Sequence, residues 1–173
     1  MRAAIELAAE GGYEAVQIRS VAQRAEVALG TIYHYFASKD VLLAVAMVEW
    51  VGAFEDLIRD DPPRGGDSRE RVLDVLDRIT RTMRGAPDIS HAMVTAMCSR
   101  GEEFNWCQEQ MHLVWSNTLS QAFDETLNSD ERDRIIRVLE HVWFSSLIAW
   151  TNEWMSLEQA TDELTDAAEA LLR

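Results

Sequence analysis

The most informative stretch of the sequence is Gly30-Thr31-Ile32-Tyr33-His34-Tyr35-Phe36-Ala37-Ser38-Lys39. Ile32 and Phe36 are four residues apart, so both can point inward from a short helix that begins at Gly30. The side chains that cover the rest of this helix are then Thr31, Tyr33, His34 and Tyr35. They offer hydroxyl groups and an imidazole to phosphates and base edges, and a methyl group for contact with thymine.

A second short helix is predicted just before this stretch, over residues 18–24, with a brief turn at Glu26-Val27 between the two. Neither helix is long enough to form a core alone, so both must pack on residues 3–9 and on a long helix that Ser38 caps. This is the geometry of a helix-turn-helix, whose second helix enters the major groove of DNA. Gly30 would allow close approach to DNA, and Lys39 would bring its charge and nearby helix amides to a phosphate.

The rest of the chain also reads as helices, separated by short breaks. A first helix is predicted to end at Gly11-Gly12, and the long helix from Ser38 at about Arg59. Asp67 with Glu70, and Ser156 with Gln159, resemble capping boxes. An unbroken helix is predicted from Glu102 to about Leu127. The expected fold is all-α with about nine helices, divided into a helix-turn-helix domain over 1–45 and a larger helical domain over 46–173, for which the family resemblance described below implies effector binding and dimerisation.

The charge of the chain is unevenly distributed. The 173 residues carry a net charge of −14, which argues against a nonspecific binder of nucleic acid or of anionic membranes. Residues 1–45 contribute only −1 of this charge, and residues 46–173 contribute −13. The acidic part should repel DNA, so only one end of the molecule can face a duplex.

Several classes of protein are excluded by what the sequence lacks. It has no apolar run long enough to span a bilayer and no secretory signal at its start, so a cytoplasmic location without membrane contact is expected. Cys98 and Cys107 are then expected to be reduced thiols. There is no glycine-rich phosphate loop, His-Glu-x-x-His or Cys-x-x-Cys motif, so no enzyme, metal site or cofactor is predicted.

Gly11-Gly12-Tyr13-Glu14-Ala15-Val16-Gln17-Ile18-Arg19 and the run from Val21 to Lys39 resemble the DNA-binding domain of TetR-family repressors. Within that family the chain is most similar to repressors of bacterial cholesterol catabolism. The resemblance implies phosphate contacts from Arg19, Tyr33, Tyr35 and Lys39, and base-edge or groove contacts from Leu29, Gly30, Thr31 and His34. The partner it implies is double-stranded operator DNA.

Three features depart from the family pattern. Glu26 stands where many members have glycine in the turn, and Ala28 where many have a capping serine. Members also usually carry a basic N-terminal arm before the position of Ala3, and this sequence begins at Met1 without one.

The middle helices are rich in methionine and aromatic residues, which adapt to bulky apolar ligands but also serve as ordinary core. With the family resemblance, the predicted lining residues are Met83, Met93, Met97, Cys98, Phe104, Trp106, Met111 and Trp115. The subgroup implies a coenzyme A thioester of a sterol-derived acid, or a related fatty acyl thioester, as effector. Arg81, Arg84 and Arg100 could meet its polar end, although surface salt bridges explain these arginines equally well.

A single short recognition helix reads few base pairs, so a two-fold dimer with its two helices one DNA turn apart is expected. The last two helices are the candidate interface, through Trp143, Leu147, Trp150, Leu164 and Leu171. These same residues could instead be core within one chain. The predicted function is a repressor that a bulky apolar effector releases from a palindromic operator. The alternative is a helical ligand-binding or protein-interaction dimer without DNA-binding activity.

Overall fold

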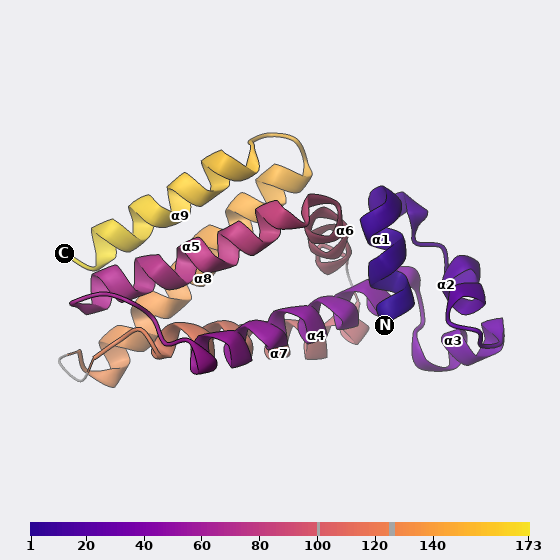
Figure 1. Cartoon of the computed structure of the whole chain (residues 1–173), viewed down its shortest axis with the longest axis horizontal. Helices are drawn as coiled ribbons and strands as arrows, with labels where there is room; N and C mark the ends of the chain where they lie inside the picture. Colours follow the sequence, from indigo (N-terminus) through magenta and orange to yellow (C-terminus); the bar gives the residue numbers. More distant parts are fainter. Residues whose placement is uncertain (100, 125–126) are drawn as a thin grey trace. The chain divides into compact units, whose positions relative to one another are not determined.

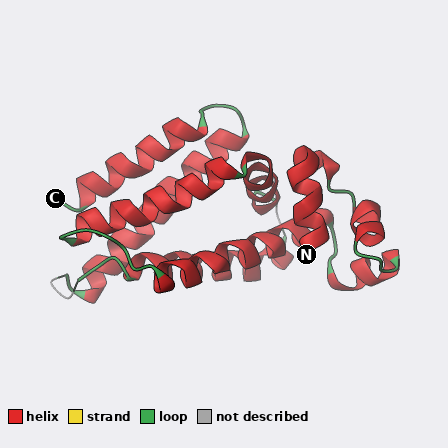
Figure 2. Cartoon of the chain, viewed as in Figure 1, coloured by secondary structure: helices red, strands yellow, loops and turns green. Residues whose placement is uncertain are grey.

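The computed structural model describes residues 1–99, 101–124 and 127–173. Within these ranges the chain forms nine α-helices and one short 3₁₀ helix, and no strand (Figure 2). The α-helices are α1 (Arg2–Ala15), α2 (Ile18–Arg24), α3 (Leu29–Tyr35), α4 (Lys39–Asp60), α5 (Ser68–Gly85), α6 (Pro87–Met97), α7 (Asn105–Ser120), α8 (Ser129–Thr151) and α9 (Leu157–Leu171), and the 3₁₀ helix is η1 (Glu102–Phe104). The prediction of an all-α fold is confirmed.

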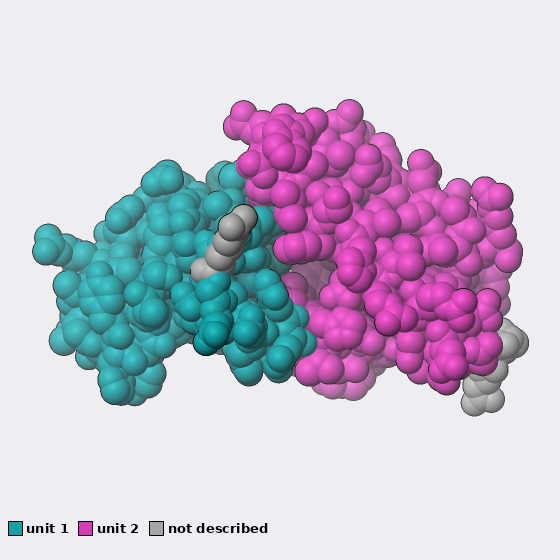
Figure 3. Space-filling view, turned by 180° about the vertical axis from the view of Figure 1, so that it is seen from behind, with its two compact units in different colours: residues 1–50, 86–110 teal, residues 51–85, 111–173 magenta. Residues whose placement is uncertain are grey.

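Two compact units make up the described chain (Figure 3). Unit 1 contains residues 1–50 and 86–110, and unit 2 contains residues 51–85 and 111–173. The chain passes from one unit to the other within α4, between α5 and α6, and within α7. Each unit therefore combines segments that are distant in the sequence.

The core of unit 1 forms where α1 lies beside α6, as Figure 1 shows. Small residues on both helices, among them Ala4, Ala8, Ala92 and Ala96, are fully buried, which lets the two backbones approach closely. The same cluster includes Val21 of α2 and Ile32 of α3, with Phe36 packed against it. The short helices are thus held by the core of unit 1, as the sequence predicts.

Helix α1 is broken at Gly11 and Gly12, where the helix was predicted to end. Gly12 has a φ of 64° and a ψ of −158°, a conformation that suits glycine because it has no Cβ. One further turn, Tyr13–Ala15, follows the kink. The break redirects the chain so that Tyr13 packs against the core cluster of unit 1.

Helices α2 and α8 end in the same kind of turn, a Schellman motif. After α2, the Val27 N–H donates to Ala22 O at 3.0 Å and the Glu26 N–H donates to Gln23 O at 3.2 Å. The left-handed position of this motif is normally glycine, but here Glu26 occupies it, with a φ of 56°. The end of α8 repeats the arrangement, with Glu153 at a φ of 60°.

In unit 2, α9 packs on both α8 and α5. Buried Ile135, Leu139 and Trp143 lie along one face of α8, and Leu164 is buried on α9. Two predicted caps are present: Ser156 and Gln159 form a complete capping box at the start of α9, and Asp67 Oδ1 accepts from the Glu70 N–H at the start of α5. These helices therefore begin where the sequence predicts.

The prediction of one unbroken helix from Glu102 to about Leu127 is wrong. A 3₁₀ turn occupies its start, and α7 ends at Ser120; residues 125 and 126 lie outside the described ranges. The end of α7 is set by α5, because Arg71 Nε donates to Ala122 O at 2.8 Å and the Asp124 N–H donates to Ser68 Oγ at 3.1 Å. These contacts come from a distant segment, so no local pattern predicts them.

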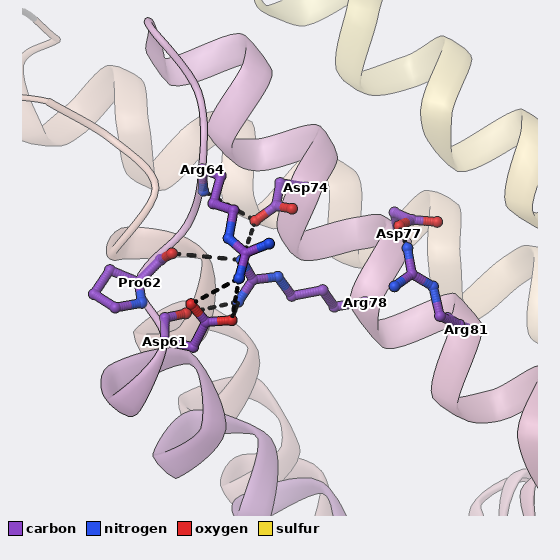
Figure 4. Close-up of polar contacts among 7 residues, drawn as sticks. All are labelled: Asp61, Pro62, Arg64, Asp74, Asp77, Arg78 and Arg81. Carbon is purple, nitrogen blue, oxygen red and sulfur yellow. Dashed lines mark hydrogen bonds and ion pairs between the residues drawn. The ribbon is translucent and has the colours of Figure 1, made fainter.

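A group of ion pairs holds the connection from α4 to α5 (Figure 4). Arg78 donates to Asp61 O at 2.6 Å and pairs with the Asp74 carboxylate at 2.6 Å. Asp74 also accepts from the Arg64 N–H at 3.0 Å, so one carboxylate ties the loop backbone to the helix. Because Arg78 is largely buried, these contacts are shielded from solvent more than ordinary surface pairs.

Replacing Glu26 by glycine is expected to stabilise the protein by about 0.5–1 kcal/mol. The left-handed conformation destabilises a residue that has a Cβ by about 1–2 kcal/mol. Glycine removes this strain, but its larger conformational freedom in the unfolded chain offsets about 0.5–1 kcal/mol of the stabilisation. Chemical denaturation measures the change. Glu26→Ala is the control, because it removes the carboxylate and keeps the strain. If Glu26→Gly is no more stable than Glu26→Ala, the left-handed strain is not the cause.

Candidate nucleic-acid interface

The surface of the predicted DNA-reading helix is open to solvent. Every residue from Gln23 to Thr31 is exposed, Ile32 is buried, and residues 33–35 are exposed again. The side chains of Tyr33 and Tyr35 are 56% and 70% exposed, which is unusual for tyrosine. Helix α3 is thus anchored by one apolar side chain and presents polar and aromatic groups around it.

Seven of the eight residues predicted to contact DNA are exposed in unit 1, namely Arg19, Leu29, Gly30, Thr31, Tyr33, His34 and Tyr35. The rings of His34 and Tyr35 meet edge to face, with centroids 5.0 Å apart. Neighbouring hydroxyl, imidazole and threonine groups therefore lie on one short helix. Such groups can donate to phosphate oxygens and to base edges.

Lys39, the eighth residue, is half-buried against Tyr13. Its Nζ lies 3.6 Å from the centre of the Tyr13 ring and donates to Tyr13 O at 3.2 Å. An ammonium group has three N–H donors, and this hydrogen bond uses one. The sequence predicted the place of Lys39 at the start of α4 but not its contact with the end of α1.

Asp40 joins three segments of unit 1. Its carboxylate accepts from the Tyr13 hydroxyl and from Ser99 Oγ, the latter at 2.6 Å. Burial and the hydrogen bond to Asp40 raise the pKa of Tyr13 well above its usual range. The end of α1, the start of α4 and the segment after α6 are thereby tied together directly behind Lys39.

Arg24 is held by an ion pair across unit 1. Its two terminal nitrogens donate to the two carboxylate oxygens of Glu10, at 2.7 and 2.8 Å. This pairing raises the pKa of Arg24 and lowers the pKa of Glu10. Both arginines of α2, Arg19 and Arg24, are exposed, and this contact engages the guanidinium of Arg24 with a carboxylate of the same unit.

Val27 is an exposed residue of this surface that the sequence did not single out. Its side chain is 40% exposed, in the turn that leads into α3. The signal was present, because a valine in a turn has no buried face to join. Helical spacing predicts which residues of a helix point inward, and it gives no such prediction for a turn.

The residues predicted to line an effector pocket are distributed over both units. Met93, Met97 and Phe104 are buried in unit 1, and Met83 and Trp115 are buried in unit 2. Met111 is half-buried, whereas Cys98 and Trp106 are exposed. Of the arginines considered for the polar end, Arg81 is paired with Asp77, Arg84 is exposed, and Arg100 lies outside the described residues.

Helix α7 contains a buried hydroxyl group without a hydrogen-bond partner in the described structure. Thr118 is only 2% exposed, and its Oγ1 has no partner. It shares one face of α7 with Met111 and Trp115, which are seven and three residues earlier. Trp115 Nε1, in contrast, donates to Ile136 O at 3.1 Å. An unpaired buried hydroxyl costs about 1–3 kcal/mol, so Thr118 marks a place where a polar group would be stabilising.

The predicted dimer residues occupy different environments within the single chain. Trp143, Leu147 and Leu164 are buried in unit 2, Trp150 is half-buried, and Leu171 is 38% exposed. A second face of α8 points outward, and its residues also recur every three or four positions. This outward face carries Arg137, Val138, His141, Phe144 and Ile148, of which Phe144 is 41% exposed.

No helix in the described ranges has the length and hydropathy needed to cross a membrane. Cys98 and Cys107 are both free thiols. Desolvation by neighbouring protein atoms, only partial at the exposed Cys98, raises the pKa of each.

Two protein families match the chain. Residues 1–46 match the family described as bacterial regulatory proteins, tetR family. Residues 65–171 match the family described as tetracyclin repressor-like, C-terminal domain. The first match covers α1, α2 and α3, so it includes the whole exposed surface described above.

The chain is 34% identical to the HTH-type transcriptional repressor KstR of Rhodococcus jostii, over 98% of this chain and 79% of that protein. A TetR transcriptional regulator from Rhodococcus sp. RHA1 has a similar solved structure, with a TM-score of 0.83 at 27% identity, covering 99% of this chain and 92% of the other. The fold is also similar to that of FadR from Bacillus subtilis in complex with stearoyl-CoA, with a TM-score of 0.63 at 18% identity over 96% and 94% of the two chains.

Replacing Tyr13 by phenylalanine is expected to lower the free energy of unfolding by about 1–2 kcal/mol, because hydrogen bonds to charged groups are worth about 1.5–3 kcal/mol and this one is partly exposed. The pKa of Tyr13 is raised by folding, so its contribution is complete below about pH 10 and declines as the pH rises above that value. The difference between wild type and variant should therefore shrink in alkaline solution. Denaturation measured from pH 7 to pH 11 tests this.

The matched control is Tyr33→Phe, which removes the same hydroxyl from an exposed ring. It is expected to leave stability unchanged at every pH. Equal losses in the two variants would contradict a specific role for the contact between Tyr13 and Asp40.

Proposed function

The chain belongs to the tetR family of bacterial regulatory proteins, and we propose that it is a ligand-responsive transcriptional repressor that binds operator DNA through α3. The observation that carries this proposal is the environment of α3, where Ile32 alone is buried and Tyr33, His34 and Tyr35 face solvent. Its relatives are named as transcriptional repressors, and the family consists of regulators rather than enzymes.

The two proposed activities, DNA binding and effector binding with dimerisation, are assigned to successive parts of the sequence. Residues 1–45 bind DNA, with Arg19, Tyr33, Tyr35 and Lys39 on phosphates and residues 29–31 and His34 at the base edges. Residues 46–173 bind the effector and a second copy of the chain. The net charge of −13 on this larger part supports the division, because it disfavours contact with a phosphate backbone.

Dimerisation is proposed through α8 and α9 with two-fold symmetry. The buried positions Trp143, Leu147 and Leu164 support the pairing of α8 with α9 inside each chain. We propose that the outward face of α8 then meets the partner, with Phe144 near its centre. Charge favours this contact, since that face carries Arg137, while α9 exposes the acidic residues Glu158, Asp162 and Asp166.

The proposed effector is a bulky apolar molecule, for which a sterol-acid or fatty acyl coenzyme A thioester is the specific candidate. The similarity to KstR and the buried methionine and aromatic side chains support it. The unpaired hydroxyl of Thr118 adds a polar group that such a ligand can engage within an apolar setting.

Release from DNA is proposed to follow from linkage. A ligand that fits one arrangement of the middle helices shifts the dimer toward that arrangement. Helix α4 begins at Lys39, directly after the DNA-binding segment, and continues to Asp60. A displacement carried by α4 would change the separation of the two α3 helices and misalign both half-sites.

Removing the hydroxyl groups of α3 is expected to weaken operator binding without affecting the fold. Tyr33→Phe and Tyr35→Phe should each reduce affinity for the chain's own upstream DNA by about two- to tenfold, because one hydrogen bond contributes about 0.5–1.5 kcal/mol. Fluorescence anisotropy at fixed salt measures the affinity, and sedimentation should find two copies of the chain on one duplex.

Trp154→Phe is the matched control, since Trp154 is an exposed aromatic residue of unit 2. It is expected to bind DNA as the wild type does. A wild-type protein that binds no DNA would favour the alternative of a ligand-binding dimer without DNA-binding activity.

Replacing Thr118 by valine is expected to stabilise the ligand-free protein by about 1 kcal/mol, because it removes an unpaired buried hydroxyl. It should also weaken the binding of stearoyl-CoA or a sterol-acid coenzyme A thioester, and raise the concentration at which either ligand releases DNA. Thermal denaturation measures the change in stability, and calorimetry measures the affinity for the ligand.

Thr80→Val is the comparison, because Thr80 is also fully buried but donates to Asp77 O at 3.1 Å. Its stability should fall slightly, opposite in sign to Thr118→Val. If Thr118→Val is destabilised as well, or if saturating ligand leaves operator affinity unchanged, the proposed effector contact is wrong.

A further inference from the structure

We propose that the turn leading into α3 reads the methyl groups of thymine, and that Val27 is a specificity-determining residue together with Leu29. This inference rests on the proposed function, since it presumes that α3 enters the major groove. It adds a second mode of base recognition beside the hydrogen-bonding groups of α3.

The turn and the start of α3 together form a strip of four consecutive exposed apolar residues. Residues 27–30, Val-Ala-Leu-Gly, are all exposed, and none of them has a side chain that can donate or accept a hydrogen bond. Val27 is 40% exposed and Leu29 is 37% exposed. A lone exposed apolar residue is ordinary, but here two branched side chains lie two residues apart and directly before Thr31.

The backbone holds this strip in a fixed conformation. The Schellman motif after α2 binds the Val27 N–H to Ala22 O at 3.0 Å, and Ala28 O accepts from the Thr31 N–H at 2.9 Å. Hydrogen bonds therefore fix both ends of the strip. A backbone held in this way loses little conformational entropy on binding, so small apolar contacts can contribute to affinity.

The chemistry of the major groove determines what such a strip can recognise. The C5-methyl of thymine is the apolar group that a base edge presents there, while guanine, adenine and cytosine present acceptors and amino groups. An apolar side chain placed against those polar groups would desolvate them without a hydrogen bond, at a cost of about 1–3 kcal/mol each. Val27 and Leu29 therefore favour thymine and select against the other bases.

The two ends of the reading surface then differ in their chemistry. The strip at residues 27–30 recognises methyl groups, and Tyr33, His34 and Tyr35 form hydrogen bonds. A half-site should accordingly contain thymine at the positions that face the strip.

The experiment uses a duplex that the full-length wild-type protein selects from random-sequence DNA. Each thymine of the selected half-sites is replaced by deoxyuridine, which removes only the methyl group. Wild type should lose about fourfold in affinity for each contacted methyl group, because burying one such group is worth about 0.8 kcal/mol. The variant Val27→Ala/Leu29→Ala should bind the thymine duplex more weakly and show little further loss with deoxyuridine.

Leu113→Ala is the matched control, because it truncates a leucine of α7 that is 50% exposed. It should keep the wild-type ratio of affinities for the two duplexes, which shows that truncating an exposed leucine elsewhere does not change that ratio. The single variant Val27→Ile retains a branched apolar side chain at this position and leaves Leu29 intact. It should therefore keep the wild-type preference for the thymine duplex.

The outcomes separate this inference from the proposed function. If the wild type selects no duplex, the proposed function is wrong and the inference falls with it. If the wild type selects a duplex but the double variant keeps the wild-type ratio, or if the selected half-sites lack thymine, only the inference is overturned.

Discussion

The burial of Ile32 in the core of unit 1 is the contact on which the rest of the arrangement depends. Helix α3 has seven residues, far fewer than an isolated helix needs to be stable in water. It persists because Ile32 packs into a core that α1, α2, α4 and α6 also share. The same contact determines which side chains remain outside. With Ile32 inward, the tyrosines and the histidine face solvent, so one apolar residue both stabilises the helix and orients its polar and aromatic face.

Electrostatics then restrict how this surface can be used. The DNA-binding segment is close to neutral, whereas the larger part of the chain is strongly acidic. In the proposed complex, repulsion from the phosphates therefore disfavours any orientation that brings residues 46–173 to the duplex. The hydrogen bonds among Tyr13, Lys39, Asp40 and Ser99 tie α4 to α1 and to the segment after α6. A change in the segment that follows α6 thus has a short hydrogen-bonded route to the start of α4.

Much of the fold was predictable because its signals are local. The break at Gly11-Gly12, the Ser156 capping box and the inward position of Ile32 each follow from a few neighbouring residues. Contacts between distant segments were not predictable. Arg71 and Ser68 of α5 form hydrogen bonds to the segment that follows α7. Tyr13, which precedes the helix-turn-helix in the sequence, contacts Lys39, which follows it. The residues predicted for the dimer interface illustrate a second reason. Both faces of α8 have apolar residues at helical spacing, and this periodicity is the same for the face that packs inside the chain and for the face that remains exposed.

The glutamates at the left-handed positions after α2 and α8 have a consequence for how this protein can change. Every glutamate codon is a single base change from a glycine codon, so relief of the strain at Glu26 or Glu153 is within reach of ordinary point mutation. Proteins commonly sit below their attainable stability. Here the available gain in stability lies at two identifiable turns. A change to glycine at either turn can compensate for a destabilising substitution elsewhere, for instance one in the exposed face of α3.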